Sequence, residues 1–325
     1  MSDPSIAVVI PCYMVQRKVL NVIARIGPEV AAIYVVDDAC PERVEDLVTR
    51  EVRDPRVRVL RHERNLGVGA ATLTGMTAAA ADGATILVKL DGDGQMDPSL
   101  IPNFVAPILR GEADYTKGNR FFAPEYLQGM PALRLFGNGM LSFITKLSSG
   151  YWSVLDPTNG YLAIHVAVFD LIPKDKIAQR FFFESDLLFR LNLVRANVVD
   201  IPLRAAYADE TSNLRVRKVM LPFLWYLSRN LFKRIVYSYF IRDFSIGSVY
   251  LLCGVPILTF GVVFGTWEWF AYAQSGAFAS AGTVMVAALP IIVGFQLILA
   301  FFGYDIANVP RTAIHRRLAV DKRQW

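Results

Sequence analysis

Two carboxylates one residue apart, Asp91 and Asp93, stand directly after the apolar run 84–90. If this run forms a buried strand, both side chains lie at its carboxyl end, where open α/β sheets bind their ligands. Mg²⁺ in proteins is commonly held by one or two carboxylates together with phosphate oxygens of a substrate. The pattern therefore predicts a divalent-metal site that faces a nucleotide diphosphate, and the structural alternative is a solvated Asp-Gly turn.

Two better-known ligand motifs do not fit this part of the chain. A calcium EF-hand loop that begins at Asp91 would need Gly in its sixth position and Glu in its twelfth, where the chain has Met96 and Pro102. The run 67–72 is similar to a dinucleotide fingerprint, but it lacks the third glycine and does not follow the first predicted strand. We expect residues 64–67 to cap a helix near the nucleotide instead.

Strand-like and helix-like segments alternate in the N-terminal part of the chain. Apolar runs predict strands at 6–10, 33–36, 57–60 and 85–90, and helical patterns occupy 16–26, 42–52, 67–81 and 98–109. Such alternation predicts an α/β domain with a mostly parallel, Rossmann-like sheet covered by helices on both faces. A further helix is expected at 132–147.

The C-terminal part is much more apolar than a soluble protein requires. Hydrophobic residues make up 54% of the 325 residues, and the mean hydropathy is +0.35. Between 244 and 304 the only charged residue is Glu268, and the segments 245–267 and 280–303 are each long enough to cross a hydrocarbon core of roughly 30 Å. We therefore expect two transmembrane helices, because buried helices of a soluble core do not explain two such runs in tandem.

Basic residues flank this apolar pair on both sides. Arg229, Lys233, Arg234 and Arg242 precede it, and Arg311, Arg316, Arg317, Lys322 and Arg323 follow it. The excess of Lys and Arg next to membrane spans marks the cytoplasmic side, so both termini and the N-terminal domain are expected there. The aromatic segment 267–272 is expected to form the external turn. Residues 1–9 have neither the basic start nor the long apolar core of a cleaved signal peptide. A bacterial inner membrane is the expected location.

The net charge of +5 and the pI of about 9.1 point to an anionic partner. The basic residues gather beside the apolar pair rather than on a nucleic-acid module, so membrane lipid is the expected partner and nucleic acid is not. The segment 215–243 mixes Arg and Lys with aromatic residues, as amphipathic helices in the headgroup layer do, and Pro222 is expected to start or break a helix. Three scattered cysteines suit neither a disulfide framework nor a zinc site.

Six short motifs, taken in order, resemble those of the family 2 glycosyltransferases of the GT-A fold, in particular the polyprenyl-phosphate glycosyltransferases that include dolichol-phosphate mannose synthases. They are Val9–Tyr13, Val35–Asp38, Asn65–Gly69, Asp91–Gln95, Asp156–Tyr161 and Phe183–Asp186. The resemblance covers residues 1 to about 214, and the ordered set is more specific than any single motif. The C-terminal apolar pair also suits the bacterial members.

On the donor side the resemblance implies a nucleotide-sugar site and a metal site. The residues that would bind the nucleotide-sugar are Pro11, Tyr13, Asp38, Asp91 and Arg204, the first three of them around the base and the ribose. The residues that would hold Mg²⁺ or Mn²⁺ are Asp93, Gln95 and Asp91.

On the acceptor side the resemblance implies a site for a lipid phosphate. The residues that would form it are Arg120, Arg134, Asn138 and Ser212. Asn138 stands where the family has Ser, and Asn213 stands where dolichol-phosphate mannose synthases have Lys, so the contacts at these two positions differ from the family pattern. The three residues assigned to catalysis itself are Asp93, Arg120 and Arg134.

Three further side chains have two interpretations each. Glu184 and Asp186 could remove a proton from an acceptor, or they could orient Arg side chains, and the second role is favoured because a phosphate monoester with a second pKa of about 6 is already largely ionised near neutral pH. His165 lies in an apolar strand pattern, which favours a hydrogen-bonded core histidine over a catalytic one.

The resemblance implies an inverting transfer of a sugar from a nucleotide-diphosphate sugar to a polyprenyl phosphate. The division of the chain that follows is a GT-A domain at 1–214, amphipathic helices at 215–243, two membrane helices at 244–304 and a basic tail at 305–325. A glycosyltransferase with a hydroxyl acceptor is the alternative enzyme, although the chain has no Gln-x-x-Arg-Trp motif of processive synthases. A catalytically silent partner or a lipid-flipping subunit is the alternative of another class, and a homo-oligomer is compatible with the sequence.

Overall fold

The computed structural model describes residues 4–122, 132–203 and 216–321. By its internal contacts the chain divides into two compact units. The first comprises Met1–Leu231 together with Pro310–Trp325, and the second comprises Phe232–Val309. The C-terminal segment thus belongs with the N-terminal domain, although the second unit separates them in the sequence.

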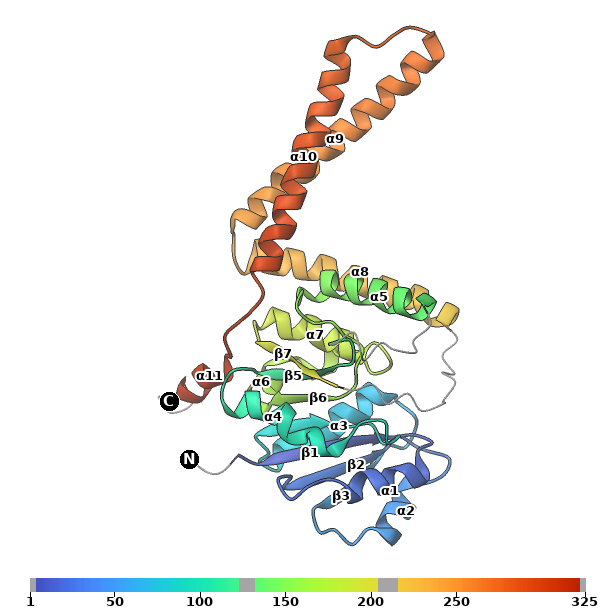
Figure 1. Ribbon diagram of the computed structural model, residues 1–325, viewed down its shortest axis with the longest axis vertical. Helices are drawn as coiled ribbons and strands as arrows, with labels where there is room; N and C mark the ends of the chain where they lie inside the picture. The colour runs from blue at the N-terminus through green and yellow to red at the C-terminus, as the bar shows by residue number, and fades with distance from the viewer. Residues whose placement is uncertain (1–3, 123–131, 204–215, 322–325) are drawn as a thin grey trace. The chain divides into compact units, whose positions relative to one another are not determined.

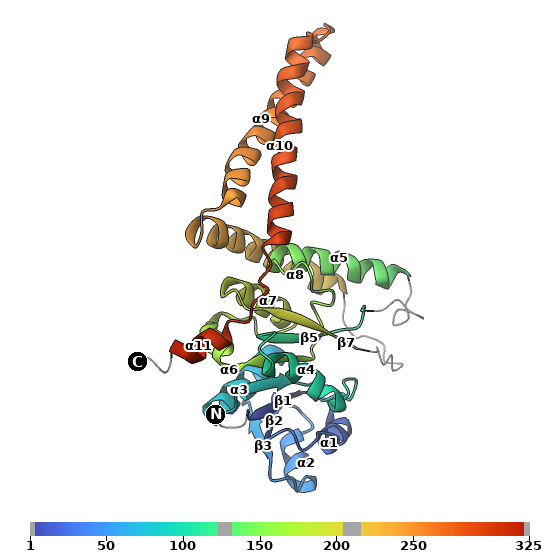
Figure 2. The same cartoon turned by 60° about the vertical axis from the view of Figure 1, so that its left-hand side comes forward.

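The first unit is built on a seven-stranded sheet with the order β3-β2-β1-β4-β6-β5-β7 (Figure 1 and Figure 2). The strands are β1 (Ile6–Cys12), β2 (Ala32–Asp37), β3 (Val57–Arg61), β4 (Ile86–Lys89), β5 (Tyr115–Asn119), β6 (Leu162–His165) and β7 (Val198–Pro202). All neighbouring pairs are parallel except those of β6, which runs antiparallel to both β4 and β5. The four predicted strands and the mostly parallel sheet are confirmed.

Helices cover both faces of this sheet. They are α1 (Gln16–Ala24), α2 (Val44–Glu51), α3 (Val68–Ala81), α4 (Ile101–Leu109), α5 (Ala132–Ser149), α6 (Val166–Leu171) and α7 (Phe183–Leu193). One face packs the β1 residues Val8 and Ile10 in a core with Val19 of α1 and Phe104 of α4. The other face carries α3, where a Cβ on Gly75 would lie 2.4 Å from Val9 Cγ1, so only glycine allows this close approach.

The helix α8 (Val216–Val236) contains Pro222 in its interior, so the expectation that this proline starts or breaks a helix is wrong. A proline inside a helix removes one hydrogen bond and costs about 3 kcal/mol. Packing of α8 on α7 offsets that cost, since Phe223 and Tyr226 contact the ring of Phe182 and Asn230 Nδ2 donates to the Asp186 carboxylate.

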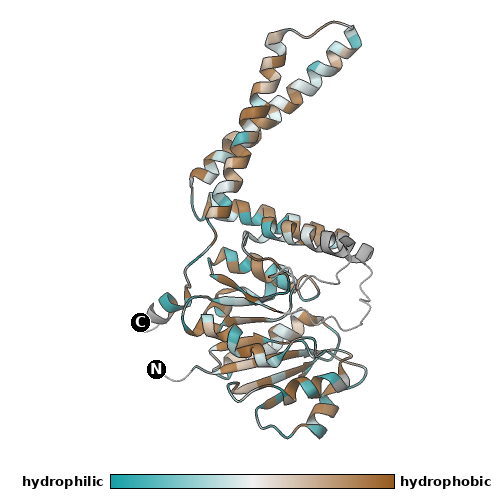
Figure 3. Ribbon diagram, viewed as in Figure 1, coloured by the Kyte–Doolittle hydropathy of each residue, from teal (hydrophilic) through white to brown (hydrophobic). Residues whose placement is uncertain are grey.

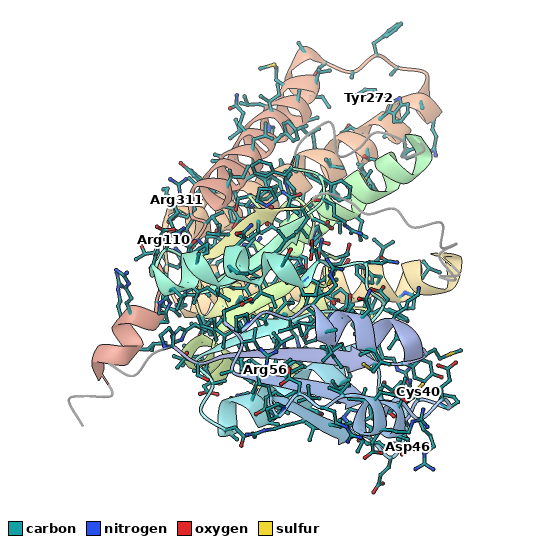
Figure 4. All side chains as sticks on the ribbon, turned by 60° about the horizontal axis from the view of Figure 1, so that its bottom comes forward. Cys40, Asp46, Arg56, Arg110, Tyr272 and Arg311 are labelled. Carbon is teal, nitrogen blue, oxygen red and sulfur yellow. The ribbon has the colours of Figure 1, made fainter. Side chains whose placement is uncertain are left out.

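The second unit is a helical hairpin of α9 (Ile246–Ser275) and α10 (Ala281–Ala307). Both helices are long and apolar enough to cross a membrane, and only 22% and 11% of their most apolar windows is buried, which argues against a soluble core (Figure 3). The helices extend beyond the predicted spans. The segment 267–272, expected to form the turn, is helical, and Tyr272 lies near the end of α9 (Figure 4).

Glycines allow the two helices of the hairpin to pack closely. A Cβ on Gly294 would lie 2.5 Å from Leu258 N, and one on Gly261 would lie 2.8 Å from Ile291 N. At the end of α10, Asp305 forms a buried, bidentate ion pair with Arg234 at 2.6 and 3.0 Å and accepts a hydrogen bond from Tyr239 at 2.6 Å. This ion pair joins the residues before α9 to the last turn of α10.

The C-terminal segment packs on the first unit through α11 (His315–Asp321). The buried Asp114 accepts hydrogen bonds from the backbone N–H groups of Ile314 and His315 and contacts His315 Nδ1 at 2.8 Å. The His315 ring stacks on that of His165, which caps α6 through a bond from Ala167 N–H to its Nδ1. Arg316 donates to the carbonyl oxygen of Arg110, a residue labelled in Figure 4.

Candidate active site

The carboxylates Asp91 and Asp93 lie just past the end of β4, as the sequence predicts. The Asp91 side chain is 31% exposed, and its Oδ1 accepts a hydrogen bond from Lys89 Nζ at 2.8 Å. Asp93 is partly exposed, and its Oδ1 accepts the backbone N–H of Gln95 at 3.0 Å. Gly94, with φ of 77°, makes the tight turn between Asp93 and Gln95 possible. The two acids therefore sit on a short, ordered turn that faces outward.

These residues fit a hard divalent cation. Mg²⁺ and Mn²⁺ prefer oxygen ligands and are often held by two carboxylates, with water and substrate phosphates completing the shell. Within the described residues, no group of three or more His, Cys, Asp and Glu is arranged to hold a metal. The exposed side chain of Gln95 adds an amide oxygen on the same turn. A cation bound here would thus depend on ligands from outside the protein, as expected at a nucleotide diphosphate.

The predicted base and ribose residues lie at the carboxyl ends of β1 and β2. Pro11 is buried, whereas Tyr13 is exposed. Asp38 is buried, and its two oxygens accept the backbone N–H groups of Leu66 and Gly67 at 2.9 and 2.8 Å. Asp38 therefore fixes the turn that precedes α3, and its contact with a ribose stays a prediction.

The same turn requires glycine at positions 67 and 69. Gly67 is the N-cap residue of α3 with φ of 104°, in agreement with the expectation that residues 64–67 cap a helix. A Cβ on Gly69 would lie 2.6 Å from the carbonyl oxygen of Ala178. These glycines let the start of α3 pack against the segment that leads into α7.

Arg120 is held by a buried acid. Its Nε donates to Asp156 Oδ2 at 2.7 Å, and its Nη2 donates to Asp156 Oδ1 at 3.1 Å. The Asp156 side chain is 1% exposed and that of Arg120 is 39% exposed. A bidentate pair of this kind fixes the plane of the partly exposed guanidinium.

The segment 156–160 connects this arginine with the carboxylates past β4. Asn159 Nδ2 donates to Asp156 Oδ2 at 3.2 Å, which closes the turn. Gly160, one residue further, lies so close to the other group that a Cβ would be 2.6 Å from both Asp91 Oδ2 and Lys89 Nζ. A single turn thus contacts both Arg120 and the pair of Lys89 and Asp91.

Glu184 and Asp186, in the first turn of α7, have different partners. Asp186 Oδ2 accepts from Ala178 N–H at 2.9 Å and from Arg190 Nε at 3.0 Å, and its Oδ1 accepts from Asn230 at 2.8 Å. This buried acid therefore orients an arginine and anchors α8, which favours the orienting role over proton removal. Glu184 Oε1 lies 3.2 Å from Lys89 Nζ.

Sequence reasoning missed a buried row of charged side chains across the sheet. The strand register aligns Lys89 with Leu162, Leu162 with Lys117, and Lys117 with Asp200. Residues opposite one another in neighbouring strands point to the same face, so these side chains share the face that α7 covers. A lysine inside the otherwise apolar run 84–90 was the signal that could have identified the first of them.

Burial and neighbouring charges shift the pKa values along this row. Burial alone would lower the pKa of Lys89, but the charges of Asp91 and Glu184 raise it above its usual value. Burial lowers the pKa of Lys117 to about 8, and its Nζ donates to the carbonyl oxygen of Asn159. Burial raises the pKa of Asp200 to about 6. The row is therefore charged at the Lys89 end and easily neutralised at the other.

Residues 7–172, about half of the chain, match the family model of glycosyl transferase family 2. The chain belongs to this family. The resemblance deduced from the six motifs is thereby confirmed, and the protein is a glycosyltransferase.

Two relatives with named activities are similar to most of this chain. The UDP-N-acetylglucosamine–dolichyl-phosphate N-acetylglucosaminyltransferase of Methanococcus voltae is 29% identical over 69% of this chain and 94% of its own length. The polyprenol monophosphomannose synthase of Mycolicibacterium smegmatis is 26% identical over 66% of this chain and 83% of its own length. Both names describe transfer of a sugar to a polyisoprenoid phosphate.

Solved structures confirm the fold. Glucosyl-3-phosphoglycerate synthase from Mycobacterium tuberculosis, in complex with Mn²⁺, UDP and phosphoglyceric acid, superimposes with a TM-score of 0.54 over 72% of this chain and 79% of its own. Because the two sequences are only 20% identical, the likeness shows the GT-A-like fold alone.

For four predicted site residues of this glycosyltransferase the structure describes no side chain. Arg204 and Ser212 fall in 204–215, as does Asn213. Arg134 and Asn138 belong to α5, and their side chains are outside the described part as well. Their roles at the donor and the acceptor stay predictions from the motifs.

Proposed function

We propose that this glycosyltransferase is a membrane-bound, inverting enzyme that transfers a sugar from a nucleotide-diphosphate sugar to a polyprenyl phosphate. The observation that carries the proposal is the turn 156–160, which holds Arg120 through Asp156 and contacts Asp91 through Gly160. An arginine suited to a phosphate is thereby fixed near the carboxylates suited to a metal and a diphosphate. The activities named for the relatives agree with this pairing.

The residues of the chain would act by positioning and by electrostatics. Asp91, Asp93 and Gln95 would hold Mg²⁺ or Mn²⁺, which when bound offsets the negative charge of the leaving diphosphate. Arg120, with Arg134 and Ser212 from the motifs, would bind the acceptor phosphate and orient one of its oxygens toward the anomeric carbon. Direct displacement by that oxygen inverts the configuration at this carbon.

Such an acceptor needs no strong base. A phosphate monoester has a second pKa of about 6 and is largely ionised at neutral pH. Asp186 is fully engaged with Ala178, Arg190 and Asn230, which is consistent with a site that does not remove a proton. A hydroxyl acceptor would need a free carboxylate or another base at the same place.

The second unit supports a membrane location. Its two long apolar helices expose most of their surface, and the chain belongs to the first unit both before and after them. An even number of crossings follows if the hairpin spans the bilayer, which is consistent with both termini in the cytoplasm. On α8 the exposed residues Leu221 and Trp225 and the basic Arg229 suit the headgroup layer.

The test is a matrix of donors and acceptors with the purified full-length enzyme. UDP- and GDP-linked sugars would each be combined with undecaprenyl phosphate, dolichyl phosphate and the matching phosphate-free polyprenols, with Mg²⁺ or Mn²⁺. We expect product with at least one sugar and a lipid phosphate, of inverted anomeric configuration by NMR, and none with the polyprenols. Transfer to polyprenol or to a glycan hydroxyl, with no product from lipid phosphate, would establish the hydroxyl-acceptor alternative.

A further inference from the structure

Lys89 is the most deeply buried charge beside the donor carboxylates. It is the last residue of β4, and its side chain is 1% exposed. Its ammonium lies 2.8 Å from Asp91 Oδ1 and 3.2 Å from Glu184 Oε1, and these two acids are 93 residues apart in the sequence, at positions 91 and 184. One nitrogen thus joins the turn after β4 to the first turn of α7.

Fold stability alone does not account for a lysine at this position. A buried charge loses its hydration, and replacing a buried ion pair by apolar side chains of similar volume is often neutral or stabilising. The neighbouring positions of β4, such as Leu87 and Val88, are apolar and fully buried. A methionine in place of Lys89 would extend this apolar strand without an ionic group.

The geometry around Asp91 shows what the ammonium does there. Lys89 contacts Asp91 Oδ1 from inside the domain, and the backbone at Gly160 closes on Asp91 Oδ2 so tightly that a Cβ would lie 2.6 Å away. Asp91 is therefore held from two sides, while about a third of its side chain faces solvent. Lys89 itself cannot reach a ligand, because it is buried beneath Asp91.

Without the ammonium, two carboxylates would face each other across a low-dielectric interior. Asp91 and Glu184 lie 2.8 and 3.2 Å from the same nitrogen, so their oxygens are close enough for strong like-charge repulsion. The result would be a displaced Asp91 and excess negative charge beside a bound diphosphate.

We propose that Lys89 is a positioning residue of the donor site, whose buried ammonium fixes Asp91 and offsets the charge of Glu184, so that a nucleoside diphosphate with its metal can bind. The inference rests on the proposed function only for the assignment of Asp91 to the donor side. It adds to that site a residue that touches neither substrate nor metal.

The test compares nucleotide binding among the unmodified full-length protein and three variants of it in detergent. The probe is UDP or GDP, whichever binds the unmodified protein more tightly, with Mn²⁺, and its dissociation constant is measured by calorimetry. We expect Lys89→Met to weaken binding at least tenfold and Glu184→Gln to change it by less than threefold. Lys89→Met/Glu184→Gln should recover most of the loss, because the repulsion then disappears. If Lys89 only stabilised the fold, the double variant would bind nucleotide more weakly than Lys89→Met.

Lys117→Met is the matched control. Lys117 is equally buried and lies in the same row of the sheet, but its ammonium donates to a backbone carbonyl rather than to Asp91. That carbonyl belongs to Asn159 in the turn 156–160, which contacts Asp91 through Gly160, so this substitution should weaken nucleotide binding less than Lys89→Met does. If Lys89→Met does not fold, Gly160→Ala supplies the second measurement, since its Cβ would displace both Asp91 and Lys89 and should also weaken nucleotide binding.

Unchanged affinity in Lys89→Met, or a double variant weaker than the single one, would overturn the inference. Normal affinity in a folded Gly160→Ala would do the same. The KM for undecaprenyl phosphate at saturating donor should stay unchanged in Lys89→Met. Because the main readout is nucleotide binding, an enzyme that binds nucleotide but does not glycosylate lipid phosphate would contradict the proposed function and leave the role of Lys89 standing.

Discussion

Arg120 Nε lies 2.7 Å from Asp156 Oδ2, and the acid is buried while the guanidinium is partly exposed. A buried carboxylate in a bidentate pair sets the direction of the arginine, whose side chain stays 39% exposed. The pair therefore presents an oriented cation at the edge of the site, next to the turn that also contacts Asp91.

Arg120→Ala should weaken the reaction with the lipid phosphate much more than it weakens donor binding. Loss of a charge-assisted contact costs about 1.5 to 3 kcal/mol, which corresponds to roughly one to two decades in kcat/KM. Arg120→Lys should recover little, because an ammonium cannot form the bidentate pair with Asp156. The measurements are kcat/KM for undecaprenyl phosphate and the nucleotide dissociation constant. Equal losses in both quantities would refute an acceptor role.

Asp93→Ala should abolish metal-dependent transfer in a protein that remains folded. Asp93 is partly exposed and accepts the local N–H of Gln95, so its removal should cost little stability. The expected result is a loss of at least two decades in kcat and a loss of Mn²⁺ binding measured by electron paramagnetic resonance. Full activity of the variant in EDTA would contradict the proposed metal site.

Asp200→Asn should stabilise the first unit at neutral pH. Burial raises the pKa of Asp200 to about 6, above the unfolded value of about 3.9, so ionisation of this group opposes folding. The destabilisation begins as pH rises through the unfolded pKa and is complete above about pH 6. Both N–H donors, from Asn119 and Leu155, bond to Oδ2, which an amide oxygen can replace.

The expected gain from this substitution is about 1 to 3 kcal/mol at pH 7.5 and close to zero at pH 4. Thermal unfolding in detergent at the two pH values measures it. Asp170→Asn is a suitable control, because its carboxylate is exposed and pairs with Lys174 in a surface bridge. A stabilisation that is the same at both pH values would speak against the raised pKa as its cause.

Asp114→Asn should release the C-terminal segment from the first unit. The substitution replaces one of the two acceptor oxygens by an NH2 group, so at least one of the N–H groups of Asn197, Ile314 and His315 loses its acceptor, at a cost of about 1 to 3 kcal/mol. Hydrogen exchange of a peptide that contains residues 314–318 should then accelerate. Unchanged protection of that peptide would show that other contacts hold the segment.

The same contact has a defined pH dependence. Burial alone would raise the pKa of Asp114, but the hydrogen bonds from His315 and the backbone N–H groups lower it below its ordinary value. A carboxylate with a lowered folded pKa stabilises the folded state above the unfolded pKa of about 3.9, and this contribution is lost as pH falls through the folded pKa. Protection of residues 314–318 should therefore persist at pH 5 to 8 and decline below about pH 4.

Local patterns in the sequence determined much of this protein. Apolar runs that end at polar residues identify the strands β1 to β4, because the periodicity that distinguishes buried strands from amphipathic helices is a pattern of neighbouring residues. Asp91 and Asp93 could be assigned to a strand end for the same reason. The two long apolar segments could be identified in the same way. The turn between them was predicted at 267–272, but this segment is helical.

Only the tertiary structure decided which distant residues meet. The antiparallel strand β6 enters between β4 and β5, and this register places Lys89, Lys117 and Asp200 in one row. Lys89 and Glu184 are 95 residues apart, and Asp114 and His315 are 201 residues apart. Each of these pairs depends on strand order and helix packing, which arise from burial over the whole domain, so no local pattern of residue types specifies them.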